Sequence, residues 1–420
     1  MFFTGVSNAE VLTLSEGLRL AIERNRVVKI TEAEELIAES DTLIRKARMF
    51  PEINASLSQT LQAHQPAAKF DHQILSISEK DFLSYSLSVQ QTLYDFKGNS
   101  SRFGASKAIL MSKKYDTKRV KNLVALDFLR LYFDLLEAEK MIAVSEKEAQ
   151  RLESHLRDAR HLYEEGTITK NDVLQAEVRI SDARQRLLAV KNQRALTASR
   201  VNNALSFPLT SDIQVADEVG ISPDRLDLNL PKAWETAEEK RPEISFTDEI
   251  LRSLDLEKTS LRSEYFPRFF LRGSYDYTEN RFQVHEDNWS LTLGMNINLY
   301  QGGSTRASIM KLENQKEQLL EQRKKLIDEI KLEVERYLLD LRNARDRIAV
   351  TETAIQQAEE NLRINKVKYE EGVGTATDVV DAVTLLTIAE TNYYRALYDL
   401  RRAEGSFLYA TGEDLTEVYQ

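Results

Sequence analysis

The side chains in this sequence whose types and spacing most clearly suggest a chemical role are two carboxylates three residues apart. Asp378 and Asp381 belong to the run Asp378-Val379-Val380-Asp381, at the start of a stretch rich in helix formers. Residues i and i+3 share one face of a helix, so the two side chains point the same way. Such a pair attracts cations and repels anions. Asp378 also suits the first turn of a helix, where an acid interacts favourably with the helix dipole.

Other reactive groups are few. The chain has no Cys, which excludes thiol catalysis, Cys-ligated zinc and disulfides. It contains no Gly-x-Ser-x-Gly, no phosphate-binding Gly-Lys-Ser/Thr and no His-Glu-x-x-His. His64 and His72 share an expected loop and could contact a metal only weakly, and we expect His155 and His161 to lie solvated on a polar helix surface. We therefore predict no enzyme activity, no metal site and no cofactor.

Composition narrows the class of protein. The 420 residues are 42% hydrophobic and 30% charged, enough to bury a core. A net charge of −10 disfavours a general nucleic-acid binder. No run approaches 18 apolar residues and the mean hydropathy is −0.43, which excludes a helical membrane span. Residues 1–9 are either the remnant of a signal peptide, with small residues at Ser7 and Ala9, or a frayed start.

The sequence is an internal duplication. Tyr163-Glu164-Glu165-Gly166 recurs 206 residues later as Tyr369-Glu370-Glu371-Gly372, and Asp172-Val173 recurs at the same interval as Asp378-Val379. Two further pairs align, Leu93-Tyr94 with Leu299-Tyr300 and Phe50-Pro51 with Phe266-Pro267. The chain therefore holds two copies of one unit: a helix, two short segments, a long helix, a tight turn and a helix.

Helices dominate each copy. Residues 101–163 and 303–369 lack Pro and predict helices of roughly 90–100 Å, at 1.5 Å per residue. Four shorter helices of about half that length are expected over residues 14–49, 172–205, 232–265 and 376–410. Because two short helices placed end to end match one long helix, we expect a packed layer of antiparallel coiled-coil helices, in which each long helix pairs with a stack of two short ones. The turns at 164–171 and 370–377 would then form one end of the bundle.

The short segments alternate like two-faced strands. Residues 83–93 and 291–299 place apolar side chains at alternate positions, with small polar residues between them. Their partners, 53–61 and 269–277, complete two hairpins with loops near 62–81 and 280–288. Aromatic residues mark the strand ends: Tyr94, Phe96, Tyr275, Tyr277, Trp289 and Tyr300. This pattern is typical of a transmembrane β-barrel with an aromatic girdle, although one face packed on a soluble core is the alternative. Four strands cannot close a barrel, so several copies are required.

The duplicated unit, with Glu-Gly-x5-Asp-Val at each turn, resembles the TolC-like outer membrane efflux protein family from about residue 12 to 412. That resemblance implies a homotrimer in the outer membrane, with four strands per chain in one twelve-stranded β-barrel and an α-helical tunnel across the periplasm. It implies a passive exit duct for drug or solute efflux or for type I protein secretion. The implied partners are a periplasmic adaptor and an inner membrane RND or ABC transporter.

The resemblance also implies roles for residues at the second turn. Asp378 and Asp381 match the family's two entrance aspartates, which in a trimer form two rings of carboxylates. The first turn carries Asp172 but Gln175 at the matching place. Gly374 stands where the best-known member has an arginine that holds the tip shut, so another link, such as Tyr369 with Asp172, would be needed. The expected contacts with the adaptor are Gly166, Thr167, Asp172, Tyr369, Gly372, Val373, Gly374 and Thr375.

The resulting organisation has two repeats around a linker. We expect a first repeat over 10–205 with its hairpin near 51–96, and a second over 232–412 with its hairpin near 267–300. Residues 206–231, interrupted by prolines, form an equatorial linker with a short strand near 213–215, and 413–420 are a short tail. Two other protein classes remain open at this point: a soluble coiled-coil scaffold and a periplasmic adaptor subunit.

Overall fold

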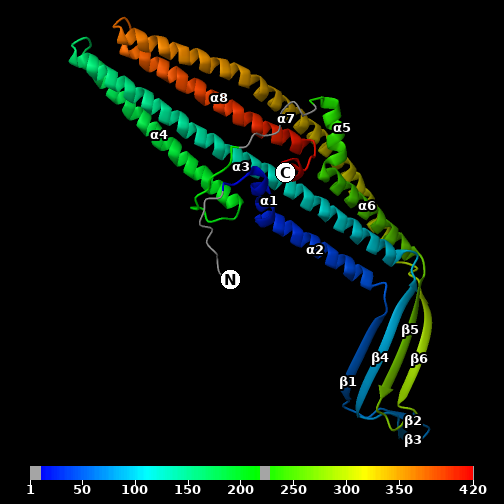
Figure 1. The fold of residues 1–420 in the computed structure, drawn as a ribbon. Coiled ribbons are helices and arrows are strands. Elements are labelled where there is room, and N and C mark those ends of the chain that lie inside the picture. Colours follow the sequence, from blue (N-terminus) through cyan, green and yellow to red (C-terminus); the bar gives the residue numbers. More distant parts are fainter. Residues whose placement is uncertain (1–10, 218–227, 420) are drawn as a thin grey trace. The chain divides into compact units, whose positions relative to one another are not determined.

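The computed structural model describes residues 11–217 and 228–419, a mostly helical chain with one four-stranded sheet (Figure 1). It divides into two compact units. The first contains residues 1–32, 116–244 and 325–420, and the second contains residues 33–115 and 245–324. Two helices of 67 residues, α3 (Gly98–Glu164) and α7 (Ser304–Glu370), begin in the second unit and end in the first.

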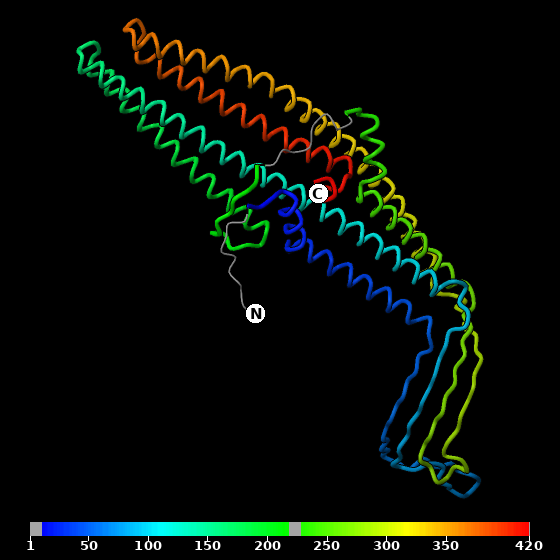
Figure 2. The backbone as a smooth tube through the Cα atoms, viewed as in Figure 1, coloured from blue at the N-terminus to red at the C-terminus, as the bar shows by residue number. Residues whose placement is uncertain are grey.

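Two helical hairpins form most of the first unit. The chain turns from α3 into α4 (Lys170–Ala204) and from α7 into α8 (Ala376–Ala410), as Figure 2 traces. The bounds of α3 and α4 recur in α7 and α8 exactly 206 residues later, so the duplicated sequence forms duplicated elements. Shorter helices of this unit are α1 (Leu14–Arg24), α5 (Leu230–Lys240) and α9 (Leu415–Val418).

The second unit carries the sheet. Its four antiparallel strands follow the order β1-β4-β5-β6, with bounds Glu52–Leu61, Asp81–Tyr94, Arg268–Thr278 and Asp287–Asn296. The central pairing joins β4 of the first repeat to β5 of the second. Helices α2 (Arg26–Ala47) and α6 (Pro242–Arg262) lead toward β1 and β5, the latter through a 3-10 turn at Ser263–Tyr265.

The register gives the sheet one apolar and one polar face. Leu57 pairs with Tyr85, and Tyr85 pairs with Tyr277, so apolar side chains line up across three strands. On the other face, hydrogen bonds connect the hydroxyl groups of Ser56 and Ser86, with their oxygens 2.8 Å apart, and those of Ser274 and Ser290, 2.9 Å apart. Successive residues of a strand face opposite sides, so the small polar residues share one face, which also carries Phe82 and Phe270 near its two ends.

An aromatic cluster on α3 anchors the linker between the repeats. Tyr132 is fully buried, and its hydroxyl donates its single hydrogen toward the carbonyls of Ala216, at 2.7 Å, and Leu12, at 3.1 Å, which share it. Leu12 also forms an isolated parallel bridge with Val215. The strand expected near 213–215 is therefore a single bridge. The signal remnant expected over 1–9, and residues 218–227 of the linker, lie outside the described residues.

The single helices expected over 14–49 and 232–265 are each broken, which corrects the sequence prediction. Asn25 leaves the helical conformation, and its side-chain oxygen accepts a hydrogen bond from the Val27 backbone at 2.8 Å, which starts α2. Arg241 is extended because Pro242 follows, and proline disfavours helical geometry in the residue before it. No described helix has a stretch long and apolar enough to cross a lipid bilayer.

Two smaller expectations also differ from the structure. The loop expected near 62–81 contains a second hairpin, β2 (Ala67–Phe70) with β3 (Gln73–Ser76), whose turn places Asp71 at a φ of 51°. The last strand ends at Asn296, three residues short of the expected end. The short tail expected over 413–420 contains α9, which buries Leu415 completely against α1 and α8.

Glu404 on α8 predicts an unusual pH dependence of stability. It is completely buried, and that burial raises its pKa from near 4.5 to about 7, although Arg401 at 3.1 Å opposes the shift. The folded chain thus prefers the protonated carboxyl, so stability falls as pH rises from about 4.5 through 7, by about 3 kcal/mol in all. We expect Glu404→Gln to abolish this decline in thermal melting profiles between pH 5 and 9. Glu417→Gln, an exposed control, should retain it.

Candidate functional site

Glycines end both long helices at the tip of the first unit. Gly166 and Gly372 adopt φ values of 77° and 74°, in the left-handed region that favours glycine. The next residue then donates its amide to the carbonyl five positions back, Thr167 to Leu162 and Val373 to Lys368, both at 2.9 Å. This is the Schellman arrangement, which satisfies the last carbonyls of a helix. Both turns expose Gly166, Thr167, Gly372, Val373 and Thr375.

Matching carboxylates cap the helices that follow the turns. Asp378 accepts hydrogen bonds from the Thr375 amide at 2.9 Å and the Thr375 hydroxyl at 2.7 Å. Asp172 does the same with Thr169, at 2.9 and 2.8 Å. The Thr375 hydroxyl and amide hold the pKa of Asp378 below its ordinary value, so its carboxylate is ionised at neutral pH.

Asp378 and Asp381 lie on the exposed side of α8, while Val379 and Val380 between them are buried. The structure therefore places the two expected carboxylates on one face, one helical turn apart. Asp378 is engaged in its own helix cap, whereas Asp381 is not part of that cap. Gln175 occupies the place of Asp381 in the first hairpin and is also exposed.

Gly374 has a packing reason to lack a side chain. A Cβ atom there would lie 3.0 Å from the Lys368 Cβ and 3.1 Å from the Tyr369 amide nitrogen. Its own amide donates to the Lys368 carbonyl at 2.9 Å. With this turn conformation, an arginine at position 374 would require the backbone to shift.

Two expectations about the tip are wrong. Tyr369 was expected at the adaptor surface and in a link with Asp172, but it is only 3% exposed, and its hydroxyl lacks a hydrogen-bond partner among the described residues. His155 was expected in solvent, but it is also 3% exposed, with its ring centre 5.0 Å from that of Tyr369. Of the two histidines expected in solvent on this helix, His161 is the exposed one. His155 is adjacent to Leu156 on α3, and the sequence could not show that the second hairpin covers this face.

A buried ion pair between the hairpins escaped sequence analysis. Arg151 on α3 donates two hydrogen bonds to Glu390 on α8, at 2.8 and 2.9 Å, and the Glu390 side chain is 7% exposed. Lys147 lies 3.8 Å from the same carboxylate. Further along the same two helices, Leu152 and Leu156 of α3 share an apolar core with Val380 and Val383 of α8. The partners are 239 residues apart, and no local motif marks either one.

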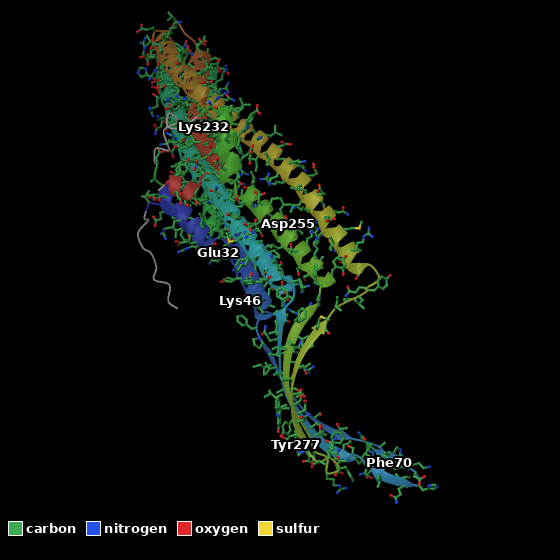
Figure 3. All side chains as sticks on the ribbon, turned by 90° about the vertical axis from the view of Figure 1, so that its right-hand side faces the viewer. Glu32, Lys46, Phe70, Lys232, Asp255 and Tyr277 are labelled. Carbon is green, nitrogen blue, oxygen red and sulfur yellow. The ribbon has the colours of Figure 1, made fainter. Side chains whose placement is uncertain are left out.

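The expected girdle aromatics gather near the two ends of the sheet. Near the loops, Tyr85 stacks on Tyr277 with ring centres 4.7 Å apart, and Tyr275 pairs with Trp289 across β5 and β6. Figure 3 shows Tyr277 at this end, with Phe70 beyond it on the β2–β3 hairpin. Near the helices, the ring of Phe96 lies between those of Tyr94 and Phe266, with its centre 4.8 Å from the Tyr94 ring centre and 4.7 Å from the Phe266 ring centre. Phe96 and Tyr300 lie just outside the strands.

The spacing of these aromatic groups suits a bilayer. From Tyr85 to Tyr94, β4 advances nine residues, or roughly 30 Å along the strand at 3.3 Å per residue. At the strand tilt of about 40° that membrane barrels have, this length spans roughly 23 Å, close to their apolar band of about 25 Å. The model of the outer membrane efflux protein family matches residues 17–206 and 236–413, most of the chain. The chain belongs to this family. The chain is therefore a channel protein of the outer membrane rather than a soluble coiled-coil scaffold or an adaptor.

Relatives of this chain align over nearly its whole length. The outer membrane efflux protein BepC of Brucella suis biovar 1 (strain 1330) is 22% identical over 414 residues, spanning 95% of this chain and 85% of BepC. The alkaline protease secretion protein AprF of Pseudomonas aeruginosa is 20% identical over 408 residues, spanning 93% and 82%. The outer membrane protein VceC from Vibrio cholerae shares the fold, with a TM-score of 0.80 over 96% of both chains at 15% identity.

Proposed function

We propose that three copies of this chain form a passive exit duct, in which each copy contributes four strands to a twelve-stranded barrel. The observation that supports it is the sheet's uncovered apolar face. Leu57 on β1 is 73% exposed and Leu293 on β6 is 71% exposed, and both strands leave one edge unpaired in the single chain. A membrane requires every backbone edge to be paired, so β1 of one copy would join β6 of the next.

The proposed gate is at the tip of the helical hairpins. With threefold symmetry, Asp378 and Asp381 would form two stacked rings, together six carboxylates across the entrance. Rings of carboxylates favour cations and exclude anions. Asp381 would act mainly through its charge, whereas Asp378 would also hold the start of α8 through its hydrogen bonds with Thr375.

The proposed partners are a periplasmic adaptor and an inner membrane transporter of the RND or ABC class. The exposed turns at Gly166 and Gly372 would contact the adaptor, because small neutral residues allow close approach of another hairpin. The duct itself would carry out no catalysis. The named functions of BepC, in efflux, and AprF, in protease secretion, are the two export modes that this arrangement would serve.

Purified full-length protein in planar lipid bilayers tests the duct. We expect discrete single-channel currents with a preference for K⁺ over Cl⁻, and a trimer that migrates as such on gels until it is heated. A protein that gives no cation-selective conductance, or that is extracted from cells without detergent, would contradict the proposal. Trimer formation without conductance would place the error in the open pathway rather than in the barrel.

A further inference from the structure

Basic side chains gather where the four strands of the second unit meet its helices. The ten residues on the helical side of each strand contain eight Lys or Arg and two acids, a net charge of +6 in a chain whose total is −10. At the other end of the sheet, the loops 62–80 and 279–286 contain three cations and four acids, a net charge of −1. Figure 3 shows Lys46 at the end of α2 that leads into the sheet. We call the four helical-side segments the basic collar: 42–51, 95–104, 258–267 and 297–306.

Most cations of the basic collar have no acidic partner. Both of its acids are engaged, because Asp95 accepts a backbone amide at 2.7 Å at the start of α3 and Glu264 lies 3.4 Å from Arg102. Lys258 pairs at 2.6 Å with Glu313, which lies outside the collar. The other six basic side chains are exposed and form no ion pair among the described residues: Arg45, Lys46, Arg48, Lys97, Arg262 and Arg306. A group of unpaired charges of one sign attracts anions.

Exposed aromatic side chains lie in the same segments as these cations. Phe50 follows Arg48 directly, Tyr265 lies three residues after Arg262, and Tyr300 precedes Arg306; all three rings are exposed. Aromatic rings mixed with basic side chains are typical of the level where hydrocarbon meets lipid headgroups. A dissolved anion would satisfy only the cations, whereas a lipid would also cover the rings. The composition of the collar therefore favours a lipid surface as its partner.

In the proposed barrel the collar would continue across the joint between copies. Strand β1 begins and β6 ends on the helical side, so joining β1 of one copy to β6 of the next would bring residues 42–51 beside the next copy's 297–306. These two segments contain four cations and no acid: Arg45, Lys46, Arg48 and Arg306. Like charges repel, so an anion between the two segments would stabilise the joint.

We propose that the basic collar binds the phosphate headgroups of anionic phospholipids in the periplasmic leaflet, most tightly at the joints between copies. Guanidinium groups suit this ligand, because each can donate two parallel hydrogen bonds to a phosphate, and Arg45, Arg48 and Arg306 supply them. The acyl chains would cover the apolar face of the sheet. A lipid that contacts two copies would also stabilise the trimer. This inference rests on the proposed barrel and adds a lipid partner to it.

Fluorescence quenching at a single introduced cysteine tests this, since the chain has none of its own. Ser100→Cys places a fluorophore in the collar, and Val284→Cys places one in a loop at the other end of the sheet; both positions are exposed. The full-length protein is reconstituted in phosphatidylcholine vesicles that contain a fixed fraction of a nitroxide-labelled quencher, either phosphatidylglycerol or phosphatidylcholine. Near position 100 we expect phosphatidylglycerol to be enriched about fivefold, the ratio given by about 1 kcal/mol per basic side chain. Near position 284 we expect no enrichment, and 1 M NaCl should reduce the enrichment at position 100 below about twofold.

Removing charge at the joint should remove the lipid preference. We expect Arg45→Gln with Arg48→Gln and Arg306→Gln to reduce the enrichment at position 100 below about twofold. The parent trimer should resist heating on gels to a temperature about 5 °C or more higher after reconstitution with phosphatidylglycerol than with phosphatidylcholine, and the triple variant should lose this difference.

A second triple variant removes the same charge elsewhere. Lys324→Gln with Lys325→Gln and Arg336→Gln replaces exposed cations twenty or more residues into α7, and it should keep the full enrichment. Equal quenching by the two lipids at position 100, or an equal loss of enrichment in both triple variants, would overturn the collar.

Single-channel recording in pure phosphatidylcholine separates the two proposals. Normal conductance with equal quenching by the two lipids overturns only the lipid site. Enrichment at position 100 without conductance overturns only the open duct. Quenching of neither label by either lipid would show that the sheet does not enter the membrane, which overturns the barrel and the lipid site together.

Discussion

Glu390→Ala is expected to destabilise the packing between the two hairpins by about 3 kcal/mol, because it leaves the Arg151 guanidinium without its bidentate partner. Truncating one member of a buried pair costs about 3–5 kcal/mol. We take the lower end because the Arg151 side chain remains 23% exposed and can recover some hydration. The measurement is the free energy of unfolding from urea melts, followed by loss of the helical circular dichroism signal.

An exposed pair on the first hairpin gives the comparison. Arg160 on α3 and Glu177 on α4 lie 2.7 Å apart, with side chains 57% and 42% exposed. Exposed ion pairs contribute at most about 1 kcal/mol, so Glu177→Ala should have a small effect. If Glu390→Ala costs no more than Glu177→Ala, the buried pair does not hold the hairpins together.

The double variant Arg151→Met with Glu390→Leu separates charge from packing. Replacing both partners of a buried pair with apolar side chains is often neutral, because no unpaired charge remains. We therefore expect its unfolding free energy to lie within about 1 kcal/mol of the parent value. A double variant as unstable as Glu390→Ala would show that shape, rather than charge pairing, is what this site requires.

Local patterns in the sequence predicted most of the helices and strands of the fold. The 206-residue interval located both turns, and it recurs in the helix bounds because identical spacing produces identical helix lengths and caps. Alternation along 83–93 indicated β4, since a period of two is a property of the strand itself. The break before Pro242 was missed, although the signal was present, because proline restricts the preceding residue.

Contacts between the repeats were beyond sequence reasoning. Arg151 meets Glu390 and His155 meets Tyr369 only because α7 and α8 pack beside α3, more than two hundred residues away along the chain. Helical periodicity shows which face of α3 is apolar but not what covers the adjacent polar positions. His155 and Tyr369 were therefore wrongly expected to be exposed, and the Arg151–Glu390 pair was not predicted at all.

Neutralising both carboxylates of the proposed gate should change ion selectivity more than stability. We expect Asp378→Asn with Asp381→Asn to reduce the preference for K⁺ over Cl⁻ severalfold and to weaken block by a trivalent cation by about tenfold or more, because six negative charges leave the entrance of a trimer. Asparagine is chosen because its side-chain oxygen can still accept the hydrogen bonds that Thr375 donates to Asp378. Alanine would remove the helix cap as well as the charge.

Two further variants assign the effect to charge at the second turn. Asp172→Asn removes the equivalent carboxylate from the first turn, where Thr169 donates the same two hydrogen bonds, and it should leave block unchanged. Asp381→Asn alone should account for at least half of the blocking free energy that the double variant loses. Asp381 is exposed and takes no part in the helix cap, so its carboxylate acts through its charge alone. If Asp172→Asn weakens block as much as the double variant, the cation site is spread over the whole tip, and the pairing of Asp378 with Asp381 has no special role. Unchanged block in the double variant would remove both residues from the gate.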